Sequence, residues 1–492
     1  MVKLRGPFYW EEFLMTVTKQ SLSACTSILV GKKASLDGSV YIGRNEDAKS
    51  AWPKHMCVHP RQEFTSEQVF TSKDNGFSMP LPKVAYKYTA TPEWTDEFGL
   101  FEEDGINEFG VAMSATESAY ANSEVLSCDP LVANGIGEEA MVTVVLPYIK
   151  TAREGVLRLG QIVSDYGASE ANGILFADDQ EAWYLEIGSG HHWVAQRIPD
   201  DAYAVVANQL AIEEIDFADT KNFLTSAGIQ AFVEANQLNP SLDGSFNFRK
   251  IFGTQTLSDQ IYSTPRVWYG QKYLTPSVEQ DPMSLELPFI RKPDRKLGLD
   301  DLSYVLGSHY QNTPYDPLNS KDPLLKKKFR PISLAKTQES HILQLRSDLS
   351  KDIKGIHWLA LGVTAQSVFV PFFAGANDVH PAYKVGKATY DPTSAYWVYK
   401  QAGILVDAHY QAFAKELSDL QTELTVSFKT AVHKVVAAVK AGEFDGNLAD
   451  FLTTESIKLQ DLGLKKYQAL SASLITQTTD MSPLNFKTDA NL

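Results

Sequence analysis

Cysteine is scarce in this chain of 492 residues, which contains only Cys25, Cys57 and Cys128. An odd number of cysteines with no CxxC spacing indicates neither a disulfide framework nor a zinc ribbon. We therefore expect no metal ion and no other cofactor. So few cysteines also favour a reducing, cytoplasmic setting.

Long apolar runs and blocks of like charge are missing as well. No stretch approaches the roughly 18 to 20 uninterrupted apolar residues that a membrane span needs. Acidic residues outnumber basic ones, 60 to 45, and give a net charge of -15 that is spread along the chain. This balance disfavours phosphate backbones and anionic membrane surfaces, so we expect neither nucleic acid nor a membrane as a partner.

The composition is that of a globular protein, with 44% hydrophobic residues. Short β-prone runs bounded by turn signals predict strands, and the first two, with an Asp37-Gly38 turn signal between them, predict a hairpin. We expect a further strand after the turn at 107–110 and an antiparallel meander in the middle of the chain. The expected strands are 26–31, 39–43, 172–177, 182–187, 191–197, 202–207, 355–362 and 367–375.

Helical spacing of apolar residues predicts helices between and after these strands. They are 138–166 with a kink at Pro147, 218–235, and two or three helices within 394–442. Strands in batches with flanking helices favour a layered α+β fold over alternating βαβ units.

The first 24 residues, MVKLRGPFYWEEFLMTVTKQSLSA, differ in character from the β-prone segment that begins at Cys25. Lys3 and Arg5 imitate the start of a secretory signal, but Glu11 and Glu12 interrupt the apolar core that such a signal needs. The ending LSAC also matches the pattern before a lipidated cysteine in bacterial lipoproteins. A noncatalytic, lipid-anchored binding protein therefore stays open as an alternative.

Cys25 lies at the start of the expected hairpin, whose second strand ends in GRNED, residues 43–47. Adjacent antiparallel strands lie about 4.8 Å apart, so Arg44 or Asp47 can reach the Cys25 end. An arginine beside a thiol favours the reactive thiolate. If residues 1–24 are removed, the α-amine of Cys25, with an ordinary pKa of roughly 7.7 to 8.0, can act as its general base. The alternative is a buried, inert cysteine.

A conventional pairing of cysteine with histidine also stays open. The candidate histidines are His55, His59, His309 and His341. The first two flank Cys57 in HMCVH, but the sequence offers no matching second group of ligands, so we expect loop or core roles for them.

The order of motifs resembles a known family. Cys25-Thr26-Ser27, Asp37-Gly38 and Arg44-Asn45-Glu46-Asp47 resemble N-terminal-nucleophile hydrolases related to penicillin V acylase and choloylglycine hydrolase, and within that group the dipeptidase A cysteine peptidases. The supporting stretches, in the expected order up to about residue 400, are GINEFG (105–110), VVANQ (205–209), STPR (263–266), SHYQNTPYDP (308–317), ESHILQLRS (339–347) and WLALGVTAQSVFVPFFAG (358–375).

The resemblance implies a four-layer αββα sandwich of two antiparallel sheets with a helical C-terminal region. Residues 1–24 would be a propeptide removed autocatalytically, 25–392 the catalytic core and 393–492 a helical region packed on that core. Met15 as the true start would shorten the propeptide and leave the Ala24-Cys25 scissile bond unchanged.

The resemblance also assigns roles to residues of the site. Cys25 would be the nucleophile, Arg44 would hydrogen-bond near the thiolate and Asp47 would hold the α-amine. Asn208 would contribute to the oxyanion hole, and Arg266 would complete the polar cluster.

The sequence departs from the acylases at their second oxyanion donor, an asparagine. The corresponding stretch here reads MSATES, residues 113–118, in which Thr116 is the candidate. The implied activity is that of a cysteine dipeptidase of broad specificity acting on small peptides, with a homo-oligomer compatible with it. The alternative is a linear amide hydrolase of the penicillin V acylase or bile salt hydrolase type. Candidates for binding a substrate terminus, without ranking, are Glu46, Glu93, Glu117 and Glu186.

Overall fold

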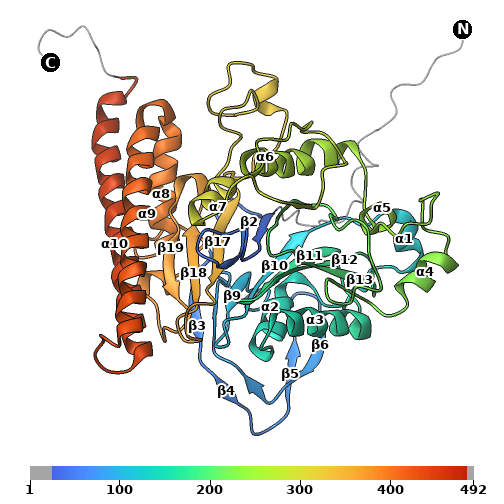
Figure 1. The fold of residues 1–492 in the computed structure, drawn as a ribbon. Coiled ribbons are helices and arrows are strands. Elements are labelled where there is room, and N and C mark those ends of the chain that lie inside the picture. The colour runs from blue at the N-terminus through green and yellow to red at the C-terminus, as the bar shows by residue number, and fades with distance from the viewer. Residues whose placement is uncertain (1–24, 485–492) are drawn as a thin grey trace, which may run out of the picture.

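Two antiparallel sheets stacked against each other form the centre of the molecule (Figure 1). The computed structural model describes residues 25–484. The seven-stranded sheet has the order β16, β14, β1, β2, β17, β18, β19, and the six-stranded sheet has the order β15, β13, β12, β11, β10, β9. Three two-stranded sheets, β3 with β8, β4 with β7 and β5 with β6, lie outside them.

The strands have the following bounds. The seven-stranded sheet contains β1 Thr26–Val30, β2 Val40–Asp47, β14 Tyr203–Val206, β16 Ile290–Arg291, β17 Thr337–Leu345, β18 Gly355–Leu361 and β19 Val370–Phe373. The six-stranded sheet contains β9 Asp104–Ile106, β10 Ala112–Ser118, β11 Asn172–Ala177, β12 Ala182–Ile187, β13 Trp193–Ile198 and β15 Phe223–Thr225. The small sheets contain β3 Cys57–His59, β4 Gln62–Glu63, β5 Gln68–Thr71, β6 Ser78–Leu81, β7 Val84–Ala85 and β8 Tyr88–Ala90.

The α-helices connect and follow the strands. They are α1 Ser123–Cys128, α2 Glu138–Val145, α3 Ala152–Tyr166, α4 Ile229–Ala235, α5 Phe248–Phe252, α6 Thr264–Leu274, α7 Leu299–Leu306, α8 Ala395–Ala408, α9 Tyr410–Ala441 and α10 Leu448–Thr478. The shorter helical turns are η1 Leu146–Tyr148, η2 Asp259–Ser263, η3 Leu325–Lys327, η4 Thr364–Gln366, η5 Pro381–Lys384 and η6 Thr479–Met481.

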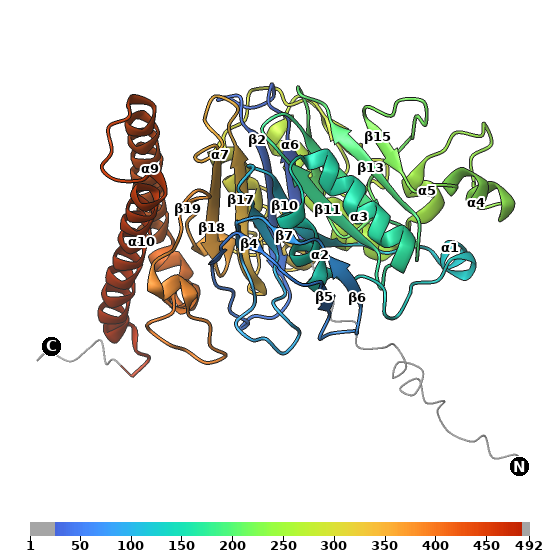
Figure 2. The ribbon, with the colours of Figure 1, turned by 90° about the horizontal axis from the view of Figure 1, so that it is seen from below.

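Three separate clusters of buried apolar side chains divide the molecule into four layers. Successive side chains of a strand point to opposite faces of a sheet. Ile28 of β1 accordingly joins the cluster beneath α6, α7 and α8, whereas Leu29 joins the cluster between the two sheets. In β11, Leu175 faces the other sheet, and Phe176 faces α2 and α3. Figure 2 shows α3 lying across the six-stranded sheet.

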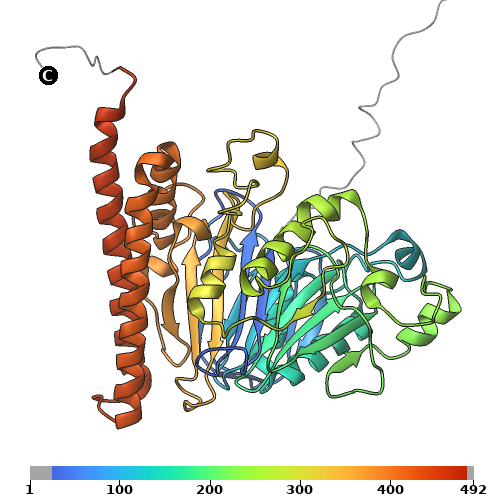
Figure 3. The same cartoon turned by 45° about the horizontal axis from the view of Figure 1, so that its top comes forward.

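The C-terminal helices pack at one end of the seven-stranded sheet. The long helices α9 and α10 lie side by side next to β18 and β19, at the opposite end of the molecule from α4 (Figures 1 and 3). The predicted α+β sandwich with a helical C-terminal region is therefore confirmed. Within residues 25–484, we find no helix that combines the length and the apolar character needed to cross a membrane.

The predicted hairpin is confirmed, and its register places the GRNED segment. Gly38 has a φ of 75° in the turn, a left-handed conformation that glycine adopts without steric cost. Ser27 lies opposite Arg44, so the same register continued by two residues places Cys25 opposite Glu46. On its other side β1 pairs with β14, where Ser27 lies opposite Val206.

Two predictions about elements were wrong in part. The strand predicted at 202–207 leaves the meander, because β14 pairs with β1 in the other sheet. Its residues Tyr203 and Ala204 belong to different apolar clusters, as expected of a strand covered on both faces. The helix predicted at 218–235 is confined to α4. Residues 223–225 form β15 instead, and Gly228, which caps the N-terminus of α4, has a left-handed backbone conformation (φ 76°) that cannot continue a helix.

The predicted helix at 138–166 is interrupted at Pro147, where η1 separates α2 from α3. The region 394–442 holds two helices, α8 and α9, as expected. A further helix, α10, follows at Leu448–Thr478, beyond the residues whose apolar spacing predicts helices but within the helical region 393–492 that the resemblance implies.

The packing of α9 on the sheet generates a test of stability. Leu424 is fully buried in the apolar cluster, whereas Val426 of the same helix is 61% exposed. Leu424→Ala should lower the free energy of unfolding by about 2 to 5 kcal/mol, because it removes packed methyl groups and leaves a cavity. Val426→Ala should change it by less than about 0.5 kcal/mol. Urea unfolding followed by circular dichroism measures both, and equal losses would contradict the packing described.

Candidate active site

Cys25 lies immediately before β1, and its side chain is fully buried. Its Sγ atom donates a hydrogen bond to Glu46 Oε2 at 3.1 Å and accepts one from Arg44 Nη1 at 3.1 Å. Arg44 and Glu46 are two residues apart on β2 and therefore share one face of the strand. The hairpin brings all three side chains together.

Arg44 fills the space between the two sheets at this point. Its Nε donates to Ser114 Oγ at 2.8 Å, and its Nη1 donates to the Thr116 carbonyl at 2.9 Å. Its Nη2 donates to Glu103 Oε2 at 2.8 Å and to the Ala115 carbonyl at 2.8 Å. With its remaining contacts to the sulfur and to Glu46, the guanidinium is fixed in one orientation.

A group of buried carboxyl groups surrounds the sulfur and the guanidinium. Glu46, Glu103 and Glu138 are close together, and Lys54 forms an ion pair with Glu103. Burial raises the pKa of Glu46 to about 8, with a further increase from the charge of Glu103. Burial opposes ionisation of Glu103 as well, but the charges of Lys54 and Arg44 outweigh it and keep its pKa below the ordinary value.

The thiol of Cys25 is held in its protonated form by the same environment. Burial raises its pKa well above the ordinary value, the charge of Glu46 raises it further, and Arg44 opposes both. These contacts are those of the chain of 492 residues, in which the backbone nitrogen of Cys25 is part of a peptide bond.

Asn208 and Arg266 form a second network on the other side of β1. Arg266 Nη2 donates to Asn208 Oδ1 at 2.7 Å, and Nη1 donates to the Cys25 carbonyl and to Thr26 Oγ1 at 3.0 Å. Because Asn208 Oδ1 accepts this hydrogen bond from Arg266, Nδ2 of the same amide points to the Ser118 carbonyl and donates to it at 2.9 Å. Both side chains are buried beside the cysteine, with which sequence reasoning had grouped them.

Asp47 lies outside these two networks. Its carboxylate accepts hydrogen bonds from the guanidinium of Arg330 and from Thr337 Oγ1. Within residues 25–484, no hydrogen bond joins Asp47 to Cys25. A register shift between β2 and β17 occurs at this position, between Thr337 and Glu339, and turns Asp47 toward Arg330.

The four acidic candidates for binding a substrate terminus occupy different positions. Glu46 touches the sulfur, Glu93 pairs with Lys54, and Glu186 accepts hydrogen bonds from two backbone amides of the loop after Asn208. Glu117 lies next to the site and is fully buried. Its Oε2 accepts a hydrogen bond from Ser27 Oγ, while Oε1 has no partner among the described residues.

Thr116, the candidate for a second oxyanion donor, has its backbone amide engaged. That amide donates to Glu138 Oε1 at 3.2 Å, and its carbonyl accepts from Arg44. The backbone of Thr116 therefore positions the carboxyl group of Glu138 and the guanidinium of Arg44.

The predicted histidine alternatives lie away from the sulfur. His309 contacts Asp316. His341 lies opposite Arg44 on the adjacent strand, and its ring contacts Asp104, Glu339 and the Ser114 hydroxyl. No described histidine is within hydrogen-bonding distance of Cys25 Sγ.

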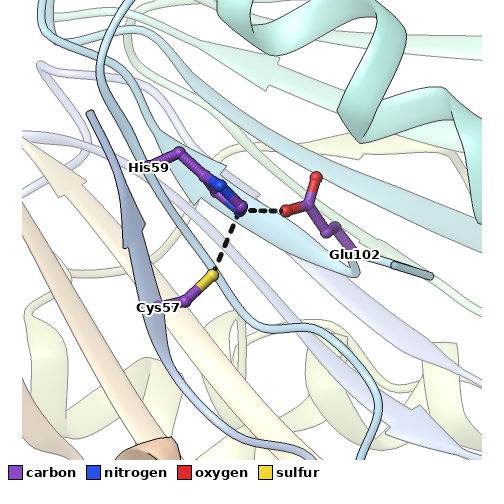
Figure 4. Close-up of side chains that lie close together, drawn as sticks. All are labelled: Cys57, His59 and Glu102. Carbon is purple, nitrogen blue, oxygen red and sulfur yellow. Dashed lines mark hydrogen bonds and ion pairs between the residues drawn. The ribbon is translucent and has the colours of Figure 1, made fainter. Parts of the chain in front are cut away.

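Cys57 and His59 meet a third residue that sequence reasoning missed (Figure 4). His59 Nε2 lies 3.2 Å from Cys57 Sγ and 2.6 Å from Glu102 Oε1. Glu102 also accepts hydrogen bonds from Tyr88 and Thr143. A nitrogen-to-oxygen distance of 2.6 Å is that of a direct hydrogen bond, and the carboxylate is satisfied by protein donors. The geometry fits a hydrogen-bonded group rather than three ligands of one ion.

Known proteins resemble this chain over most of its length. Residues 24–423 match the model of a family described as Peptidase family C69. A probable dipeptidase of Latilactobacillus sakei is 47% identical over 96% of this chain and 99% of its own length. A probable dipeptidase B of Lactococcus lactis is 40% identical over 87% and 93%, and dipeptidase A of Lactobacillus helveticus is 37% identical over 80% and 84%.

The buried carboxyl group of Glu117 generates a test by pH. Burial raises its pKa from 4.5 to about 7, so the folded chain holds this proton where the unfolded chain has lost it. Its contribution to the free energy of unfolding is therefore complete below pH 4.5 and is lost as the pH rises through about 7. The glutamine side chain of Glu117→Gln is neutral at every pH. The free energy of unfolding of this variant should therefore rise relative to that of the wild type as the pH increases from 4.5 to about 7.

Urea unfolding at the two ends of this range measures the difference. The exposed Glu67 provides the control, because Glu67→Gln should leave the pH dependence as it is. A Glu117→Gln chain whose stability keeps the full pH dependence of the wild type would contradict the assignment.

Proposed function

Because the chain belongs to peptidase family C69, we propose that it is a cysteine dipeptidase with Cys25 as its nucleophile. The observation that carries the proposal is the contact of Cys25 Sγ with Arg44 at 3.1 Å, in a site that Asn208 and Arg266 border on the other side. An arginine beside a sulfur favours the thiolate once the thiol can lose its proton.

The proposed reaction begins after residues 1–24 have been removed. The α-amine of Cys25 takes the thiol proton, and Sγ attacks the carbonyl carbon of the substrate peptide bond. Asn208 Nδ2 stabilises the oxyanion, in an orientation that Arg266 sets through Oδ1. The α-ammonium then protonates the leaving amine, and water releases the acyl group from the sulfur.

Glu117 is the proposed binding group for the free α-ammonium of a dipeptide. Its carboxyl group is buried beside the cysteine and close enough to raise the pKa of the Cys25 thiol by its charge. Its Oε1 is unpartnered in the described chain and can accept a hydrogen bond from a substrate. A carboxylate favours a charged amine over an acylated one, because a hydrogen bond between two ionised groups is stronger than one to a neutral donor.

The proposal includes small peptides as substrates, a cytoplasmic location and the absence of nucleic acid and membrane partners. A homo-oligomer is compatible with it. The alternative within the hydrolases is a linear amidase of the penicillin V acylase type. Parallel assays on free dipeptides and on acylated amines separate the two, and exclusive hydrolysis of acylated amines would favour the amidase.

Replacement of the nucleophile tests the mechanism. Cys25→Ala should retain residues 1–24 and lose hydrolysis of free dipeptides, because the same sulfur would perform both reactions. Intact mass spectrometry and a dipeptide assay measure the two effects. Cys128→Ala, which alters an exposed cysteine, is the control and should behave like the wild type. An active Cys25→Ala enzyme, or an active preparation whose N-terminus is not Cys25, would refute the mechanism.

Replacement of Glu117 tests substrate recognition. A hydrogen bond to a charged group contributes about 1.5 to 3 kcal/mol, so Glu117→Gln should lower kcat/KM for free dipeptides by roughly 10-fold to 100-fold. N-acetylated dipeptides lack the ammonium group, so their slow hydrolysis should change little. Steady-state assays on matched pairs of free and acetylated peptides measure this, and equal losses on both would exclude Glu117 as the amine-binding group.

A further inference from the structure

Removal of residues 1–24 poses a chemical problem that peptide hydrolysis does not. Before cleavage the nitrogen of Cys25 belongs to the peptide bond that is to be broken, and an amide nitrogen is not a base near neutral pH. The α-amine that serves the proposed dipeptidase reaction therefore does not yet exist. Another group must accept the thiol proton during processing, and the leaving nitrogen must gain a proton.

Glu46 is in place to serve as that group. Among residues 25–484 it supplies the one carboxylate within hydrogen-bonding distance of Cys25 Sγ, at 3.1 Å from Oε2, and the thiol is the donor in this contact. The pairing of β1 with β2, continued by one residue beyond Thr26 and Asn45, places Glu46 directly across the hairpin from Cys25. Both side chains are almost completely buried, so bulk water does not compete at this contact.

We propose that Glu46 carries the proton in autocatalytic cleavage of the Ala24-Cys25 bond, an inference that rests on the proposed function. The Sγ–H proton passes to Glu46 Oε2 as Sγ attacks the Ala24 carbonyl carbon. The bond from that carbon to the Cys25 nitrogen then breaks, and the nitrogen takes the proton back from Glu46. A thioester joins Ala24 to Sγ, and water hydrolyses it to a free carboxyl group on Ala24 and a free thiol on Cys25.

The surroundings of Glu46 raise its proton affinity toward that of the thiol. With burial and the charge of Glu103 acting together, its pKa reaches about 8, so it is a stronger base toward the Cys25 thiol than an ordinary glutamate, although burial also raises the pKa of that thiol. Arg44 touches both Oε2 and Sγ and can stabilise negative charge on either atom as the proton moves. The other groups acting on Glu46 are Glu138, whose own pKa burial raises, and Lys54, which favours the carboxylate.

The proposal predicts two bases for two stages. Glu46 serves the single processing event, and the α-amine that this event releases serves every later turnover. Loss of the Glu46 carboxylate should therefore affect processing far more than turnover. A residue needed only for folding would affect both equally.

Glu46→Gln tests this in two chains. The first is residues 1–492, in which leader release is followed by intact mass spectrometry. The second begins Met-Cys25, so that the host methionine aminopeptidase exposes Cys25 without autocatalysis, and mass spectrometry verifies the new terminus. Glu138→Gln is the matched control, because it removes a carboxylate of the same buried group that has no contact with the sulfur. Glu46→Asp retains a carboxylate on a side chain that is one methylene group shorter.

General acid-base groups contribute about 100-fold to 10 000-fold. We expect Glu46→Gln to slow leader release by at least about 100-fold, Glu46→Asp to restore part of the rate, and Glu138→Gln to remain within about 10-fold of the wild type. In the Met-Cys25 chain, the loss in kcat/KM from Glu46→Gln should be at least about 10-fold smaller than the loss in processing rate.

Three results would overturn the proposal. One is release of the leader by Glu46→Gln at the wild-type rate, and another is an equal loss in both chains. The third concerns the premise: an inactive wild-type Met-Cys25 chain, or a wild-type full chain that is active with its leader attached, would refute the proposed function itself.

Discussion

A single buried guanidinium holds the two sheets together at the point where the chemistry is expected. Arg44 sits on a central strand of the seven-stranded sheet, yet it directs its donors to Ser114 and to two carbonyl groups of β10 in the other sheet. A buried charge is costly unless it is paired and fully hydrogen-bonded. The carboxyl groups of Glu46 and Glu103 meet that requirement, and Glu103 also pairs with Lys54, so the burial of these two acids follows from this one cation.

The strands and the placement of Cys25 beside Arg44 were predictable because their signals are local. The hairpin, the strands at 172–177, 182–187 and 355–362, and the position of Cys25 beside Arg44 depend on alternation and turn residues, which lie within a few positions of each other. The crossing of β14 into the other sheet was not predictable in this way. Its pairing with β1 joins residues almost 180 positions apart, and a periodic pattern specifies no partner.

The acidic surroundings of the sulfur depend on contacts of the same long range. Glu103 and Glu138 reach the site from a loop and from α2, and each stands in a sequence context typical of exposed acids. Of the three glutamates, only the position of Glu46 could be predicted from the local sequence, since the register of the antiparallel hairpin places it opposite Cys25. The hydrogen bond between Asp47 and Arg330 depends on a register shift between β2 and β17, and nothing in the GRNED segment itself indicates such a shift.

The register of β1 places the atoms of the proposed reaction in one sheet, whereas several hydrogen-bond partners of Arg44 lie in the other sheet. Ser27 lies opposite Val206, and continuing that register by two residues brings Cys25 level with Asn208, so the proposed nucleophile and the proposed oxyanion donor adjoin the ends of adjacent strands of one sheet. Relative movement of the two sheets would leave that spacing nearly intact and would chiefly alter the contacts of Arg44 with β10. Substitutions in β10 and its surroundings thus offer a route by which the contacts of Arg44 could change while the distance between Cys25 Sγ and the Asn208 amide stays nearly constant.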